Sequence, residues 1–228
     1  PTSKVGKVTP STPMGSVDPP ILPAAFALGA NARFVARAVD TQGKTQLIPV
    51  LHRASAHRGT SLVEIFQNCW VYNDHTFADF TDKAVAADRQ IMVEHGQPLV
   101  FGKEKDKGIR LRPGTVQPEV VNLNDDGVSI DDVLVHDETD RVLAGMLAAM
   151  IPPDFPVAVG VILCEPADIS FDEAVHARVE QAKNSKGPAD LDAMFRLIHF
   201  IDEAETPVLN CCGVAKGSGK PYQITDLH

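Results

Sequence analysis

The stretch that decides the fold is Thr60-Ser61-Leu62-Val63-Glu64-Ile65-Phe66-Gln67-Asn68-Cys69. Its apolar and β-branched residues predict a buried strand over 60–69 that runs straight into a cysteine. Proteins of the α/β class place their chemistry at the carboxyl ends of parallel strands. Cys69 is therefore the first candidate for a functional residue.

The sequence before this strand alternates between helix and strand. A nearly wholly apolar segment predicts a buried helix over 20–30, with Asp18 as its N-cap and Pro19 in its first turn. Residues 34–39 predict a short strand, and the spacing of apolar residues predicts a helix over 47–57. This alternation is typical of a doubly wound parallel sheet, so we expect an α/β fold.

The sequence after Cys69 predicts elements of mixed type. They are a helix over 84–94, a hairpin of 98–102 with 108–112, a strand over 116–123, a helix over 141–151, a strand over 157–163, and helices over 170–183 and 188–203. We expect three parts: residues 1–82, residues 83–205 as a smaller carboxyl-terminal α/β extension, and residues 206–228 as a flexible tail.

Composition argues against several classes of function. The 228 residues carry a net charge of −9, so nucleic acid is not an expected partner. The longest apolar run, residues 142–151, is too short to span a bilayer, so no membrane association is expected. The four cysteines form no Cys-x-x-Cys pair and suggest no disulfide framework. This usage indicates a reducing compartment, and we expect a cytoplasmic protein.

Three interpretations of Cys69 follow from its surroundings. A cysteine on a buried strand is most often a small hydrophobic residue. A nucleophilic thiol paired with His57 or His75 is a second interpretation, although no residue pattern supports such a dyad. A ligand of a metal cluster is the third, because polar residues such as Asn68 and Asp74 flank the thiol. A cluster needs about four ligands, so the others would come from elsewhere.

Several segments, in their order and spacing, resemble one enzyme family. They are Pro1-Thr2-Ser3, Thr9-Pro10-Ser11-Thr12-Pro13-Met14-Gly15-Ser16, Asp18-Pro19-Pro20, Ala27-Leu28-Gly29-Ala30, Phe34-Val35-Ala36-Arg37, Ala56-His57-Arg58-Gly59 through Cys69, Gly96-Gln97-Pro98-Leu99-Val100-Phe101-Gly102, and Lys186-Gly187-Pro188-Ala189-Asp190-Leu191-Asp192. Over residues 1–193 the chain resembles the β subunits of the 2-oxoacid:ferredoxin oxidoreductases. The last two segments resemble the longer members, which are often assigned to 2-oxoglutarate.

The resemblance implies a fold, a reaction and a set of cofactors. The fold is part of a thiamine diphosphate-binding-type domain. Enzymes of this family decarboxylate a 2-oxoacid on thiamine diphosphate held with Mg²⁺, pass single electrons through a [4Fe–4S] cluster to ferredoxin, and transfer the acyl group to coenzyme A. They pair this subunit with an α subunit. By this resemblance Cys69 is the last ligand of the cluster, and Thr2 and Ser3 lie near thiamine diphosphate.

Parts of the family pattern are absent from this sequence. The other three cluster cysteines and the Gly-Asp-Gly motif for magnesium and diphosphate are not found, so we expect a chain that lacks an amino-terminal portion. The family usually has glycine at the position of His75, which bears on the shape of that loop. Cys211 and Cys212, in the tail, match nothing in the family.

The prediction is therefore a β subunit of a 2-oxoglutarate:ferredoxin oxidoreductase-like enzyme. The alternatives are a pyruvate or branched-chain enzyme of the same family, a non-catalytic assembly subunit, and a thiol hydrolase that uses Cys69. Arg58 is more simply a helix-end cation than a carboxylate ligand. Five basic residues around the hairpin could meet ferredoxin or coenzyme A, although a solvated hairpin is the simpler interpretation. They are Lys103, Lys105, Lys107, Arg110 and Arg112.

Overall fold

The computed structural model describes residues 3–71, 73–125, 127–187 and 190–192. The chain divides into two compact units, Pro1–Phe171 and Asp172–His228. The described part of the second unit is mainly helix α6 (Phe171–Lys186), which confirms the helix expected over 170–183. Apart from residues 190–192, the helix expected over 188–203 lies outside the described residues, as do the tail and its cysteines Cys211 and Cys212.

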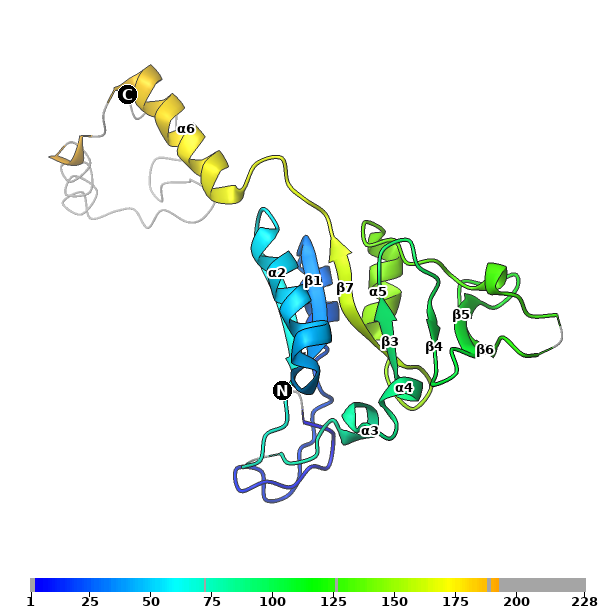
Figure 1. Ribbon diagram of the computed structural model, residues 1–228. Coiled ribbons are helices and arrows are strands. Elements are labelled where there is room, and N and C mark those ends of the chain that lie inside the picture. Colours follow the sequence, from blue (N-terminus) through cyan, green and yellow to red (C-terminus); the bar gives the residue numbers. More distant parts are fainter. Residues whose placement is uncertain (1–2, 72, 126, 188–189, 193–228) are drawn as a thin grey trace, which may run out of the picture. The chain divides into compact units, whose positions relative to one another are not determined.

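A four-stranded sheet forms the centre of the first unit (Figure 1). Its strands are β1 (Phe34–Val39), β2 (Ser61–Phe66), β3 (Gln90–Val93) and β7 (Val157–Cys164), in the order β2-β1-β7-β3. β1 and β2 are parallel, whereas β7 is antiparallel to β1 and parallel to β3. The α/β class is confirmed, and the sheet is mixed rather than wholly parallel.

The reversal of strand direction follows from the segment between β2 and β3. A parallel continuation needs a crossover connection that returns the chain to the starting end of the sheet, usually a helix. Here the connection contains only the short helices α3 (Ala78–Thr81) and α4 (Ala86–Arg89). β3 therefore begins at the end where β2 stops, and runs the other way. The helix predicted over 84–94 is wrong beyond α4, because Ile91 and Val93 alternate with an exposed Met92 as strand residues do.

Helices cover both faces of the sheet. Helices α1 (Pro23–Gly29) and α5 (Arg141–Ala149) share one apolar core with β1 and β7, and α2 (Ile48–Ala56) packs on the other face. Helix α2 follows two short helical turns, η1 (Asp40–Gln42) and η2 (Gly43–Leu47). Helix α1 begins later than predicted because Pro23, rather than Pro19, stands in its first turn; Leu22 is the N-cap and makes no side-chain bond.

A second sheet lies beyond β3. It contains β4 (Val100–Phe101), β5 (Lys107–Leu111) and β6 (Pro118–Asn122), all antiparallel in that order, which confirms the hairpin and the third strand. A turn of 3₁₀ helix, η3 (Ile130–Asp132), follows with a capping box at Ser129. None of the helices in the described part of the chain combines the length and the apolarity needed to cross a bilayer.

Strand β7 contains a glycine that the sheet requires. Gly160 has φ +117, a backbone conformation that side-chain-bearing residues rarely adopt. A Cβ atom added to it would lie 2.5 Å from the carbonyl oxygen of Val93 in β3. The close approach of β7 and β3 at this point therefore depends on the missing side chain.

Candidate functional site

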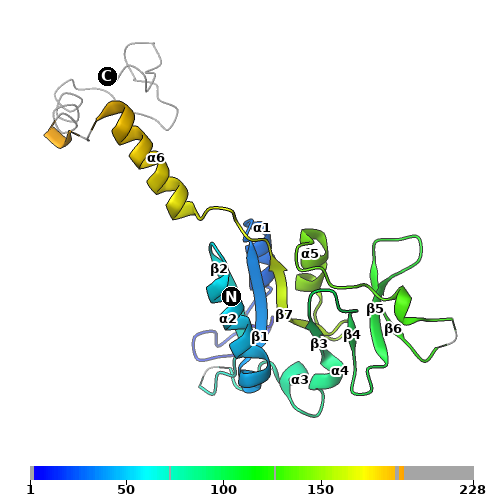
Figure 2. The same cartoon turned by 45° about the horizontal axis from the view of Figure 1, so that its top comes forward.

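Two loops meet at the carboxyl ends of β1 and β2. Figures 1 and 2 show the amino-terminal loop and the segment after β2 side by side. The Lys4 Nζ atom lies 3.2 Å from the Asp79 carboxylate, and the positive charge of Lys7 helps to lower the pKa of Asp74. The structure thus brings together two segments that the sequence analysis selected separately.

Cys69 lies in a turn that follows β2 rather than at the end of the strand itself. The strand ends at Phe66, and Cys69 is exposed. The backbone amide of Asn73 donates to the carbonyl of Cys69 at 3.0 Å. The Asn68 amide donates to Asp74 at 2.7 Å, and the backbone amide of His75 donates to Asn68 Oδ1 at 2.9 Å. These bonds hold the turn closed with the cysteine at the surface.

His75 occupies the left-handed conformation that a glycine would adopt without strain. Its φ is +57. The loop therefore keeps the backbone shape that glycine favours, although the residue differs. Asp74 has a pKa below its ordinary value, mainly because the Asn68 amide donates to its carboxylate and also because His75 lies close to it. The turn is therefore negatively charged at neutral pH.

The hydroxyl residues of the amino-terminal loop, which include the predicted Thr2 and Ser3, differ in their surroundings. Thr2 lies outside the described residues, and Ser3 is half-buried in the loop beside the Cys69 turn. The Thr9 hydroxyl lies 2.7 Å from that of Thr12 and 3.1 Å from that of Ser11, so these three groups satisfy one another at the surface. Ser3, the described residue that was expected near thiamine diphosphate, makes no such bond to a neighbouring hydroxyl group among the described residues.

The described residues do not make a cluster site by themselves. No three His, Cys, Asp or Glu side chains among them come together in a way that could hold a metal ion. The other described cysteine, Cys164, pairs with Phe34 at the starting end of β1, whereas Cys69 follows the finishing end of β2. The described part of the chain thus offers one candidate ligand, Cys69, and not four. The buried Oδ1 atom of Asn73, beside Cys69, also has no hydrogen-bond partner among the described residues.

A buried ion pair holds β2 against β1, and the sequence analysis missed it. Arg37 is 2% exposed, and its Nε donates to Glu64 Oε2 at 2.8 Å. Its Nη2 donates to the carbonyl of Ala148 at 3.1 Å, and its guanidinium lies over the ring of Phe66. The signal in the sequence was an arginine in the middle of an apolar strand. This pair fixes the strand that leads into the Cys69 turn.

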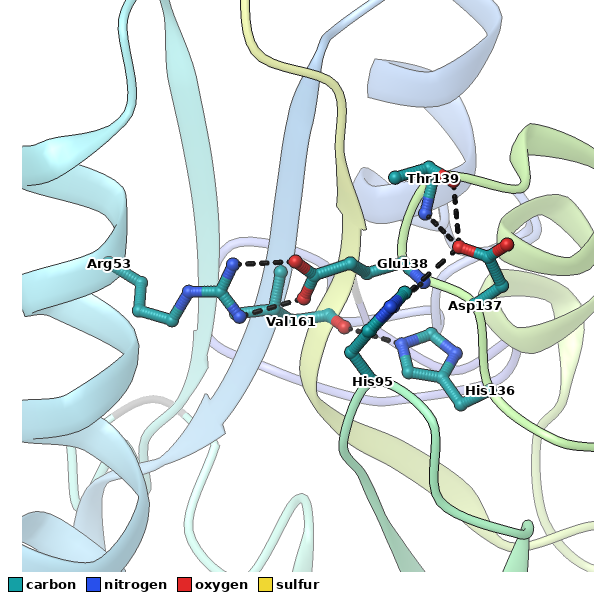
Figure 3. Close-up of polar contacts among 7 residues, drawn as sticks. All are labelled: Arg53, His95, His136, Asp137, Glu138, Thr139 and Val161. Carbon is teal, nitrogen blue, oxygen red and sulfur yellow. Dashed lines mark hydrogen bonds and ion pairs between the residues drawn. The ribbon is translucent and has the colours of Figure 1, made fainter.

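A second polar cluster lies near the opposite end of the sheet. Figure 3 shows Arg53 of α2 and Glu138 pointing toward one another, joined by two hydrogen bonds of 2.7 Å. His57 lies near this end too, beside Ser61 and the carbonyl of Glu165, so it is not placed to pair with Cys69. Burial raises the pKa of the Cys164 thiol, and the charge of Glu138 raises it further. Cys164 is therefore not an activated nucleophile.

His136 makes this cluster sensitive to pH. It is 1% exposed, and its Nε2 donates to the carbonyl of Val161 at 2.9 Å. Burial lowers its pKa below the ordinary 6.5, although the charges of Glu138 and Asp137 act in the opposite direction. The imidazole is therefore held neutral in the folded protein.

Lowering the pH is expected to destabilise the fold through His136. Because the unfolded chain binds this proton more readily, the free energy of unfolding should fall as the pH drops below about 6.5, with a slope of up to about 1.4 kcal/mol per pH unit. The pKa values of Asp137 and Glu138 are lowered in the fold, so their contributions to the free energy of unfolding are lost at still lower pH. Urea denaturation at a series of pH values measures this slope. His136→Gln should flatten it between pH 5 and about 6.5, whereas the exposed His52→Gln should not; equal slopes in all three proteins would contradict the assignment.

The basic residues of the hairpin are largely neutralised by neighbouring carboxylates. Lys107 lies 2.7 Å from Asp88, and Arg110 lies 2.8 Å from Glu119. The pKa of Glu119 is lowered chiefly by its hydrogen bond from Arg110. A solvated, internally paired hairpin fits these contacts. Arg58 lies at the starting end of β2 and is therefore not beside the Cys69 turn.

Comparison with known proteins gives two relatives in sequence. No protein-family model matches the chain. It is 39% identical over 204 residues to the 2-oxoglutarate oxidoreductase subunit KorB of Mycobacterium tuberculosis, an alignment covering 89% of this chain and 53% of the relative. It is 33% identical over 85 residues to the 2-oxoacid:ferredoxin oxidoreductase subunit beta of Saccharolobus solfataricus, covering 37% of this chain and 28% of that one.

A solved structure shares the fold. It is the 2-oxoglutarate:ferredoxin oxidoreductase from Magnetococcus marinus with 2-oxoglutarate, coenzyme A and succinyl-CoA bound. The TM-score is 0.53 at 19% identity, and the match covers 86% of this chain and 50% of that one. The chain thus spans about half the length of the M. tuberculosis and M. marinus chains.

Proposed function

This chain is a relative of the 2-oxoacid:ferredoxin oxidoreductase β subunits, of the 2-oxoglutarate type, and on that premise we propose that it contributes to the oxidative decarboxylation of 2-oxoglutarate. The resemblance expected from the motifs is confirmed by the M. tuberculosis relative. In this proposal coenzyme A accepts the acyl group and ferredoxin accepts the electrons. An α subunit, which the subunit naming of the relatives supports, completes the enzyme.

The observation that carries the proposal is the position of Cys69. The thiol is exposed on a turn that Asn68, Asp74 and His75 close, at the carboxyl ends of two parallel strands. A thiolate ligand needs access to the iron and a fixed backbone around it. The proposed role of Cys69 is one ligand of a [4Fe–4S] cluster, a group that supplies one-electron transfer. Its other ligands would come from residues outside the described part.

The amino-terminal loop has a supporting role in this proposal. Ser3, together with Thr2, is proposed to face thiamine diphosphate and its Mg²⁺. The ion pair between Lys4 and Asp79 keeps the loop beside the Cys69 turn, so both cofactor regions would lie at one edge of the sheet. The solved neighbour supports only the fold. The coenzyme A in its structure is bound to that protein.

Replacing Cys69 by serine tests the proposal in the assembled complex. We expect Cys69→Ser to lower the iron and acid-labile sulfide content and to reduce 2-oxoglutarate-dependent, coenzyme A-dependent reduction of ferredoxin by at least about tenfold, because serine is a poor replacement for a thiolate ligand. The matched control is Cys164→Ser, at the other end of the sheet, which should keep both. Full cluster content and full activity in Cys69→Ser would contradict the assignment.

The same assay separates the alternatives. Faster turnover of pyruvate or a branched-chain 2-oxoacid than of 2-oxoglutarate would move the chain to another member of the family. A complex that contains no iron, sulfide or thiamine diphosphate would indicate an assembly subunit. Hydrolase activity that thiol alkylation abolishes would support the nucleophilic interpretation of Cys69.

A further inference from the structure

Three glutamine side chains form a continuous chain of hydrogen bonds at the carboxyl end of β1. The backbone amide of Val39 donates to Gln46 Oε1 at 2.8 Å, and Gln46 Nε2 donates to Gln42 Oε1 at 3.0 Å. Gln42 Nε2 donates to Gln90 Oε1 at 3.2 Å, and Gln90 Nε2 donates to the carbonyl of Phe80 at 2.7 Å. We infer that this glutamine chain positions the turn that carries the proposed cluster ligand.

The two ends of the glutamine chain fix its direction. A backbone N–H only donates and a carbonyl only accepts, so each side-chain amide between Val39 and Phe80 has one orientation. Gln46 is 2% exposed and Gln90 is 8% exposed. A buried polar network whose members are satisfied is rigid, whereas one broken link leaves buried groups without partners. The chain therefore holds helix α3 in a defined orientation relative to β1.

Helix α3 depends on contacts with the sheet. It has four residues, and a helix this short is not stable alone. Phe80 lies in its last turn, where carbonyl groups have no partner within the helix, and Gln90 supplies that partner. The Phe80 ring packs against Phe66, the last residue of β2, with the ring centroids 5.0 Å apart. The ring contact holds α3 on the sheet, and the directional bond from Gln90 fixes its orientation.

Two hydrogen bonds connect α3 to the residue before Cys69. The amide of Ala78, the first residue of α3, donates to the carbonyl of His75 at 3.2 Å. The amide of His75 donates to Asn68 Oδ1 at 2.9 Å. The ion pair between the amino-terminal loop and α3 is exposed and contributes little. A change in the orientation of α3 is therefore passed to the Cys69 turn, and the glutamine chain is a buried polar link that prevents it.

The inference rests on the proposed function, because a fixed turn matters to the chemistry only if Cys69 binds a cluster. In that case the glutamine chain fixes the direction from which the thiolate meets the iron. Groups that orient a ligand tune the metal it binds. The backbone agrees with such a role, since Gln46 lies in η2, a single π-helical turn, and turns of this kind occur often at functional sites.

Hydrogen exchange in the full chain tests the positioning role. Gln42→Met replaces the middle amide, at a half-buried residue, by a side chain of similar length that makes no such bonds. We expect exchange at the amides of residues 73–82 to become faster by about tenfold or more, because two links are broken. Exchange in helix α5 should stay within about twofold of the parent.

Gln42→Glu tests the direction of the chain with almost no change of shape. Its carboxylate still accepts from Gln46 but cannot donate to Gln90. If the fixed direction holds the turn, exchange at 73–82 should become faster in this variant too. If Gln42 only fills space, Gln42→Glu should behave as the parent does, and that result would overturn the inference.

Two controls separate positioning from general loss of stability. Ile109→Val removes a buried methyl group from the core beside the second sheet, and should not make exchange at 73–82 faster than exchange elsewhere. Gln117→Met makes the same substitution at an exposed glutamine and should leave exchange unchanged. Equal effects of Gln42→Met and Ile109→Val on residues 73–82, or no effect of Gln42→Met, would contradict the positioning role.

The assembled complex provides a second readout. At unchanged iron content, Gln42→Met should alter the g values or line width of the reduced cluster in electron paramagnetic resonance, and Gln117→Met should not. An unaltered signal together with faster exchange would overturn the role toward the cluster ligand. A parental complex without iron would instead overturn the proposed role of Cys69, and exchange at 73–82 would still show whether the glutamine chain holds the turn.

Discussion

Replacing Glu64 by alanine is expected to lower the free energy of unfolding by about 3–5 kcal/mol, which is the usual cost of removing one partner of a buried ion pair. The side chain of Arg37 is 3% exposed and that of Glu64 is 14% exposed. Without the carboxylate, the guanidinium would keep only the carbonyl of Ala148 and the ring of Phe66 as neighbours. Urea denaturation followed by circular dichroism measures the change.

Two controls separate the buried pair from ordinary surface charge. Asp79→Ala removes the partner of Lys4 in a pair whose side chains are 72% and 45% exposed, and should change stability by no more than about 1 kcal/mol. The double substitution of Arg37→Met with Glu64→Leu should cost less than Glu64→Ala alone, because it leaves no unpaired charge. A loss for Glu64→Ala no larger than that for Asp79→Ala would show that the pair does not hold β2.

Replacing Gly160 by alanine is expected to destabilise the protein by about 3 kcal/mol or more, through backbone strain and overpacking together. The φ of +117 is unfavourable for alanine, and the new methyl group would meet the carbonyl oxygen of Val93 at 2.5 Å. That oxygen belongs to the backbone of β3, so it can move only if the strand moves. Thermal unfolding of the variant measures the effect.

The matched control is Gly145→Ala in helix α5. Gly145 lies inside the helix, and a Cβ there would have nothing within 4 Å. This substitution should stabilise the protein by about 0.5–1 kcal/mol, because alanine loses less backbone freedom on folding. The two glycine variants are thus predicted to differ in sign. A Gly160→Ala protein as stable as the parent would contradict the tight packing of β7 on β3.

The local sequence pattern was sufficient to predict an element where the apolar residues of that element alone determine its type and its bounds. The apolar run of 34–39 predicted β1 with the bounds that the structure shows, and the apolar spacing of 47–57 predicted α2 closely. The residues 90–93 were misassigned because helix-forming residues precede them, and their pairing with β7 is a long-range contact. The antiparallel direction of β7 is also a long-range property that no local pattern encodes.

The candidate site was predicted in part. The sequence selected Cys69 and its polar neighbours, and the structure shows why they act together, since Asn68 closes the turn onto Asp74 and His75. The buried pair of Arg37 and Glu64 was missed because strand register, and not sequence distance, places the two residues opposite one another. The expected division at residue 82 and the roles of Thr2 and Ser3 stay predictions.

The strand directions of the mixed sheet determine whether oxidation can join the two described cysteines in a disulfide. Cys164 lies where β1 begins and Cys69 lies beyond the point where β2 ends, so roughly the length of a six-residue strand, about 20 Å, separates the two thiols. A disulfide requires Cα atoms within about 7 Å. Oxidation therefore cannot close a ring between these two cysteines while the sheet is intact. A Cys69–Cys164 cross-link within one molecule of an aged sample would therefore report molecules that had already unfolded.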